Sequence, residues 1–233
     1  MVFKRENRPN RFFQCLKITT IAVGLLWLIH LFQFLSYSDL GNWGILPRTD
    51  FGLKGILFSP WIHGSWSHLM SNTPPLFALL TLILYFYRRI SFPAIFMIYL
   101  LTGILVWVFG RQVFHIGASG VIYGLVAFVF WLGIFRRNVR SVALAILVGF
   151  YYGSMILGVF PGQEGISWES HLLGAISGMI IAFLFKNIEE EEDIASRNRR
   201  TAFEKYERDY FLPREIFDIP RQKDEWFQNK TLS

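Results

Sequence analysis

Six apolar runs separated by polar segments constrain the fold of this chain more than any other feature. Each approaches the roughly 20 residues that an α-helix needs to cross the hydrocarbon core of a bilayer. Hydrophobic residues make up 53% of the chain and its mean hydropathy is +0.37, values typical of a membrane protein. We therefore predict an all-α, polytopic membrane helix bundle. Its six transmembrane helices are expected over residues 15–37, 66–87, 91–109, 117–135, 141–160 and 168–185.

The charged residues predict how this bundle lies in the membrane. Twelve of the 17 acids follow Asn187, whereas Arg and Lys gather before the first run and directly after the second and fourth runs. Because loops rich in Lys and Arg stay in the cytoplasm, both chain ends are predicted to be cytoplasmic. We expect a basic arm at 1–14, a membrane domain at 15–186 with a long outer loop at 38–65, and a charged tail at 187–233. The expected location is the bacterial plasma membrane. Because the charges are so unevenly placed, the net charge of +6 says little about nucleic acid, and no nucleic-acid partner is expected.

Polar side chains at the start of every second run carry the chemical signal. The second run begins with His68 and Asn72, the fourth with Ser119 and the sixth with His171. These three runs cross the membrane in the same direction, so their polar groups are expected at one depth near the outer surface. Ionisable residues within a membrane usually mark a functional site. We therefore place a candidate site at the outer ends of these helices.

Small residues predict that two of these helices pack closely. Starting from His171, the spacing i+3 and i+7 puts Gly174 and Gly178 on the same face. The fourth run offers a matching face at Gly120 and Gly124, with Ser119 beside Gly120. Small residues let membrane helices approach almost to backbone contact. Packing these faces together would bring the serine hydroxyl to the histidine.

The expected pair is a Ser–His dyad without a third acidic member. Tyr123 lies one turn after Ser119 and is expected to lie against the ring of His171. Glu169 precedes the histidine by two residues and should therefore face elsewhere. The imidazole is thus predicted to be held by packing, and to act as a base it must be neutral.

Two further side chains are candidates for stabilising a tetrahedral oxyanion. His68 and Asn72 share a helix face at i, i+4, and both donate hydrogen bonds. Together with the backbone N–H of Ser119 they would form an oxyanion hole. The alternative is that they only join helices by hydrogen bonds. Gly117 and Ala118 are expected to leave room for a scissile bond.

Histidines on the outer side raise the alternative of a zinc site. They are His63, His68, His115 and His171. However, no carboxylate or cysteine lies at ligand spacing and the sequence HExxH is absent. The single cysteine, Cys15, excludes an internal disulfide and a cysteine-based site. We therefore predict neither a metal nor another cofactor.

Three motifs in this order resemble the rhomboid family of intramembrane serine proteases, and the resemblance covers about residues 15–186. The motifs are His68-Leu-Met-Ser-Asn72, Gly117-Ala118-Ser119-Gly120 with Tyr123, and His171-Leu-Leu-Gly174 with Gly178.

This resemblance implies a role for each residue. Ser119 would be the nucleophile and His171 the general base. His68 and Asn72 would belong to the oxyanion hole, and Tyr123 would stack on the base. The outer loop would be the membrane-embedded segment beside the active site.

The chain departs from the family pattern at a few positions. Ser170 stands where alanine is common, Pro74 and Pro75 are unusual, and the outer loop has no clear Trp-Arg pair. None of these changes removes a group with an implied catalytic role.

The resulting hypothesis is an intramembrane serine endopeptidase. It would hydrolyse peptide bonds in or near transmembrane segments of membrane proteins within a lipid bilayer. Its oligomeric state is not predicted. One alternative is a non-catalytic rhomboid-like protein that binds transmembrane helices. The other is a small transporter, which the clustering of polar groups near one surface disfavours.

Overall fold

The computed structural model describes residues 8–162 and 167–210. The start of the predicted basic arm (1–7), Glu164 in the last outer loop and the tail beyond residue 210 lie outside the described residues. Six helical segments are long and apolar enough to span a membrane. This confirms the all-α, six-span prediction. Their helices are α1 (Arg8–Ser36), α3 (Trp66–Phe86), α4 (Ser91–Phe109), α5 (Ser119–Arg136), α6 (Val139–Tyr152) and α7 (Trp168–Phe185).

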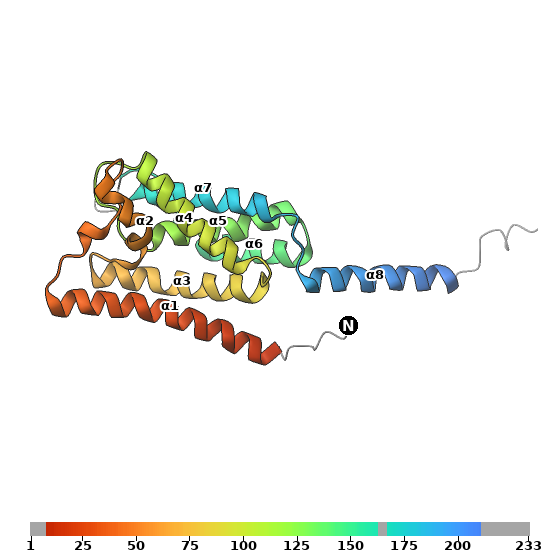
Figure 1. Ribbon diagram of the computed structural model, residues 1–233. Helices are drawn as coiled ribbons and strands as arrows, with labels where there is room; N and C mark the ends of the chain where they lie inside the picture. The colour runs from red at the N-terminus through yellow and green to blue at the C-terminus, as the bar shows by residue number, and fades with distance from the viewer. Residues whose placement is uncertain (1–7, 163–166, 211–233) are drawn as a thin grey trace, which may run out of the picture. The chain divides into compact units, whose positions relative to one another are not determined.

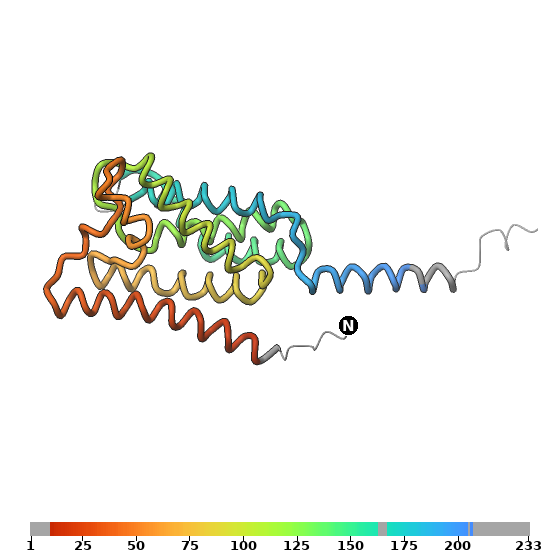
Figure 2. Tube along the Cα trace, viewed as in Figure 1, coloured from red at the N-terminus to blue at the C-terminus, as the bar shows by residue number. Residues whose placement is uncertain are grey.

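The helix α5 forms the centre of the bundle. It packs most extensively on α7 and also contacts α6, α3 and α4, while α1 lies at the edge against α3 (Figure 1). Leu125, Phe128 and Leu132 of α5 are fully buried. A helix that is apolar on all sides is expected in such a position. Figure 2 shows the chain reversing between successive spans, so that α3, α5 and α7 begin at the same end.

Glycines bring the backbones of α5 and α7 into direct contact. A Cβ atom added to Gly174 would lie 2.0 Å from the carbonyl oxygen of Gly120, and one added to Gly178 would lie 2.0 Å from that of Gly124. No residue with a side chain fits at Gly174 or Gly178 unless the helices separate. The small-residue faces predicted from the spacing therefore meet in the structure.

The connection between α1 and α3, called the outer connection because it lies at the end of the bundle that is predicted to face outward, folds as a chain of short helices. These are η1 (Gly41–Trp43), η2 (Asp50–Lys54), α2 (Gly55–Phe58) and η3 (Ser59–Trp61). An isolated antiparallel bridge joins Ile45 to His115, in the segment between α4 and α5. The Trp107 indole N–H of α4 also donates to the Thr49 carbonyl at 3.0 Å. These contacts hold the connection against the outer ends of α4 and α5.

The prediction of one continuous α-helix over 141–160 is wrong beyond Tyr152. There α6 gives way to the 3₁₀ helix η4 (Gly153–Val159). Glycine at both ends of this segment weakens the α-helix. In addition, the carbonyls of Met155 and Gly158 accept hydrogen bonds from side chains of other helices. By contrast, α3 continues through its two internal prolines.

The described residues divide into two units, with the boundary between Ile188 and Glu189. Within the described part of this second unit, α8 (Glu191–Tyr210) is a charged helix with an i, i+4 ion pair between Arg200 and Glu204. The assignment of this unit to the cytoplasm stays a prediction.

Candidate active site

Ser119 is the first residue of α5, and the turn before it is built on Gly117. This glycine has φ of +104°, a conformation that residues with a side chain rarely adopt. Its N–H donates to the Ser59 carbonyl of η3 at 2.8 Å. As the first residue of a helix, Ser119 has a backbone N–H with no acceptor inside that helix. The turn therefore presents a hydroxyl and a free backbone donor together.

His171 and Ser119 meet by hydrogen bonding across the α5–α7 contact. His171 Nε2 lies 2.9 Å from Ser119 Oγ. The other ring nitrogen, Nδ1, lies 2.9 Å from the carbonyl oxygen of Gly158 in η4. Because a carbonyl only accepts, Nδ1 must carry the ring hydrogen. In the neutral imidazole, Nε2 is then an acceptor for the serine O–H.

Tyr123 packs against one face of the His171 imidazole. Its ring stacks on His171 with 4.1 Å between centroids and 8° between planes. The Tyr123 hydroxyl in turn donates to the Met155 carbonyl of η4 at 2.7 Å. The base is thus fixed in orientation by a stacked ring and in tautomer by a main-chain carbonyl.

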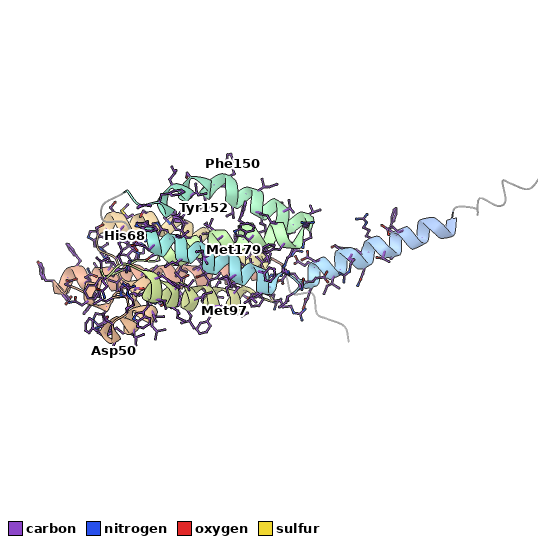
Figure 3. The ribbon with its side chains drawn as sticks, turned by 90° about the horizontal axis from the view of Figure 1, so that it is seen from above. Asp50, His68, Met97, Phe150, Tyr152 and Met179 are labelled. Atoms are coloured by element: carbon purple, nitrogen blue, oxygen red, sulfur yellow. The ribbon has the colours of Figure 1, made fainter. Side chains whose placement is uncertain are left out.

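His68 and Asn72 of α3 line the same cavity as this pair. The cavity measures about 760 Å³ and reaches from the start of α3 to Tyr152 of α6 and Met155 of η4. Figure 3 shows His68 and Tyr152 toward the end of the bundle that carries Asp50 of the outer connection. Within the described residues, the buried Asn72 Nδ2 has no hydrogen-bond partner. It is therefore a donor available to a group inside the cavity.

The ring of His68 lies directly over Gly117. A Cβ at this glycine would approach His68 Cε1 to 2.5 Å and Nε2 to 2.6 Å. The space that the sequence analysis assigned to a scissile bond is thus occupied at Gly117 by imidazole. A peptide bond in the cavity would lie beside this ring rather than above the glycine.

The ring of His63 contacts the ring of His68 edge to face. From the sequence, His63 was considered only as a possible metal ligand. Its side chain is fully buried, and the two imidazoles lie 4.9 Å apart between centroids. Burial, with a smaller contribution from the neighbouring His68, lowers the pKa of His63 to about 4. His63 is therefore neutral in the folded protein at pH 7.

The histidines do not converge on one point. The ring nitrogens of His115 lie against the Ser167 hydroxyl and the Arg111 carbonyl. These hydrogen-bond partners differ from those of His171. Among residues 8–162 and 167–210, no group of three or more His, Cys, Asp or Glu could hold a metal ion.

The two η4 carbonyls that hold the site together were not predicted from the sequence. Their only residue-level signal is Gly158, where a Cβ would lie 2.1 Å from the Tyr123 hydroxyl. The run holds three glycines, at 149, 153 and 158, and the last two were the available signal that the α-helix ends early.

A membrane bundle with a serine and a histidine hydrogen-bonded between two spans belongs to the class of helical intramembrane proteins with a buried polar site. The sequence profile of the Rhomboid domain matches residues 51–188, a range that contains all the candidate site residues. The chain therefore belongs to the rhomboid family. This family includes intramembrane serine proteases and also inactive members.

Similarity to other proteins covers most of the chain. An uncharacterized protein of Mycobacterium tuberculosis is 40% identical over 179 residues, which cover 71% of this chain and 74% of that protein. An uncharacterized protein of Mycobacterium leprae is 36% identical over 195 residues, covering 78% and 77%. RHOMBOID-like protein 4 of Arabidopsis thaliana is 30% identical over 139 residues, which cover 55% of this chain and 33% of that protein.

Proposed function

We propose that this protein is an intramembrane serine endopeptidase that cleaves peptide bonds in or near transmembrane segments of other membrane proteins. One observation carries the proposal: His171 Nε2 lies 2.9 Å from Ser119 Oγ while Nδ1 is engaged by a carbonyl. This is the separation and tautomer that a general base needs to remove the serine proton.

In the proposed reaction, Ser119 Oγ attacks the scissile carbonyl carbon as His171 Nε2 takes up its proton. The carbonyl oxygen becomes an oxyanion. The imidazolium then returns this proton to the leaving amine as the C–N bond breaks, which leaves an acyl-enzyme. A water molecule, deprotonated by the same nitrogen, hydrolyses the ester and restores the serine.

The oxyanion would be stabilised by donors that already face the cavity. The backbone N–H of Ser119 stands at the start of α5, where the positive end of the helix dipole favours negative charge. The amide of Asn72 has no partner among the described residues, and the His68 ring lines the same cavity. Such preorganised donors are typically worth about 100- to 1000-fold in rate each.

The substrate is proposed to be a transmembrane protein that reaches the cavity from the bilayer. The cavity extends between α3, at Ser71 and Pro75, and the α6–η4 segment, at Tyr152 and Met155. A peptide bond inside a helix is shielded by its own hydrogen bonds, so the substrate must unwind near the cut. We place the site at the outer surface of a bacterial plasma membrane, with both chain ends in the cytoplasm.

The proposal is tested with purified protein in proteoliposomes that contain a model transmembrane substrate. Wild-type protein should cleave it, and Ser119→Ala and His171→Ala should each abolish cleavage while the melting temperature is kept. A serine-directed fluorophosphonate should label Ser119. Ser177→Ala is the matched control, because this buried serine of α7 donates to the Leu173 carbonyl of its own helix and has no other hydrogen-bond partner among the residues that the structure describes. It should retain activity.

Cleavage by either site variant would contradict the dyad. A folded wild-type protein that binds transmembrane peptides but neither cleaves nor becomes labelled would instead identify a non-catalytic rhomboid-like binder.

A further inference from the structure

An ion pair between an exposed arginine and a buried glutamate joins the segment before Ser119 to the start of the helix that carries His171. Glu169, at the outer end of α7, is only 5% exposed. Arg111, in the segment between α4 and α5, donates from Nε to Glu169 Oε1 and from Nη2 to Oε2 at 3.1 Å. Such a two-pronged pair fixes direction as well as distance.

A second polar connection joins the same two segments. The His115 ring is buried, its Nε2–H donates to the Arg111 carbonyl at 2.9 Å, and its Nδ1 accepts from the Ser167 hydroxyl. Ser167 and Ser170 are themselves hydrogen-bonded at 2.6 Å. Burial lowers the pKa of His115, so the ring is neutral and both donates and accepts. His115 precedes Ser119 by four residues, and Ser167 likewise precedes the histidine of the site by four.

The glycine contact between α5 and α7 cannot by itself set the position of His171 along the helix axis. Gly174 and Gly178 meet backbone rather than interlocking side chains. This contact holds the two helices close together, while the position of the first turn of α7 also depends on the groups at its N-terminal end. Since a displacement of about 1 Å in an active site costs on the order of 100-fold in rate, another restraint is needed.

We propose that Arg111, Glu169 and His115 are positioning residues that clamp the α4–α5 segment to the start of α7 and thereby set the separation of the Ser119 hydroxyl and the His171 ring. This inference rests on the proposed proteolytic function. It also accounts for the buried carboxylate two residues from the base: among the described residues this carboxylate accepts hydrogen bonds from Arg111 and not from the imidazole.

The test uses the full chain in proteoliposomes with the transmembrane substrate. Glu169→Gln keeps the shape but loses the charge, and Arg111→Lys keeps the charge but loses the fork. Both should lower kcat and the rate of fluorophosphonate labelling at least roughly tenfold, with KM unchanged. Reversing the pair, with Arg111→Glu and Glu169→Arg together, should recover part of the activity that either reversal alone removes. Glu204→Gln, which breaks the exposed pair with Arg200, is the control and should leave all values unchanged.

The outcomes separate this inference from the function on which it rests. If wild-type protein cleaves and labels but the Glu169 and Arg111 variants do so at the same rate, the clamp is refuted. A lower melting temperature with unchanged kcat at low temperature also refutes it, because the pair is then only structural. If wild-type protein neither cleaves nor labels, the proposed function fails and the clamp falls with it.

Discussion

The imidazole of His171 is oriented by a carbonyl group where many serine hydrolases use a carboxylate. The Gly158 carbonyl fixes the tautomer as an aspartate would, because it too accepts from Nδ1–H. It carries no full negative charge, so it stabilises the imidazolium formed in the proposed reaction less strongly. The Tyr123 ring stacks on the imidazole with 4.1 Å between centroids and so keeps the imidazole from tilting. Orientation at this site is thus obtained from helix packing and main-chain atoms.

A substitution of Asn72 distinguishes between its two possible roles, as a donor in an oxyanion hole or as a hydrogen-bonding group that joins helices. Asn72→Ala should lower kcat by about 100- to 1000-fold, with little change in melting temperature. The reason is that Asn72 Nδ2 has no partner among the described residues, so the resting protein loses no hydrogen bond of that group. Proteolysis rates in proteoliposomes and thermal melting in detergent would measure both quantities.

Thr73→Ala is the matched control for that substitution. Thr73 accepts from the Trp27 indole N–H at 3.0 Å and so joins α3 to α1. Its loss should lower stability by roughly 0.6 kcal/mol and leave the rate unchanged. An Asn72 variant that behaves in the same way would show that Asn72 only joins helices.

Among the helices, the α5–α7 contact explains why the site could be foreseen from spacing. The positions of Gly174 and Gly178 relative to His171 are a local property of an α-helix, and the structure brings this face to α5. Hydropathy likewise located the six spans, because each must match the thickness of the bilayer. Both predictions depend on residues that are close together in the chain.

The elements that were not predicted depend on contacts between distant residues. The α6 helix changes to η4 where the Met155 and Gly158 carbonyls meet α5 and α7. A main-chain acceptor is present in every residue, so the sequence does not mark which carbonyl is used. The short helices of the outer connection are held by pairs such as Ile45 with His115, which are equally distant in the chain.

A substitution within the glycine contact should separate the two helices. In Gly178→Ala, the added methyl would lie 2.0 Å from the Gly124 carbonyl oxygen, and such overpacking typically costs about 1–3 kcal/mol. Both the melting temperature and kcat should fall, because α7 carries the base.

The comparison is Gly24→Ala in α1, where nothing lies within 4 Å of the new methyl. This variant should be as stable as the wild type or slightly more stable. Equal melting temperatures for the two variants would rule out a tight contact.

On the scale of the whole molecule, the basic residues that predict a cytoplasmic end also tie together helix ends there. Arg11 donates to the Tyr85 carbonyl, Arg136 to the Phe185 carbonyl at 3.2 Å and Arg140 to that of Phe86 at 3.4 Å. These acceptors lie in the last turns of α3 and α7, where free carbonyls and the helix dipole favour a cation. The charge asymmetry therefore serves the proposed orientation and the packing of the bundle at once, at the end opposite the site.

Global stability should depend on pH through His63. The unfolded chain binds a proton at this imidazole near pH 6.5, whereas the folded protein binds it only near pH 4 because the ring is buried. Between these values the unfolded state holds more protons, so stability falls as the pH falls. The contribution is fully present above about pH 6.5, and up to about 3 kcal/mol is lost by pH 4. Melting temperatures of the purified protein in detergent, measured from pH 7.5 to 4.5, would follow this loss.

The variant His63→Gln removes the titrating group and should flatten this pH dependence, even if its melting temperature at pH 7.5 is lower. Gly24→Ala serves again as the control, because it should shift the whole curve without changing its slope. Parallel curves for wild type and His63→Gln would assign the acid sensitivity to other groups. A flatter curve for the His63 variant alone would show that protonation of the buried imidazole next to His68 lowers stability at acid pH.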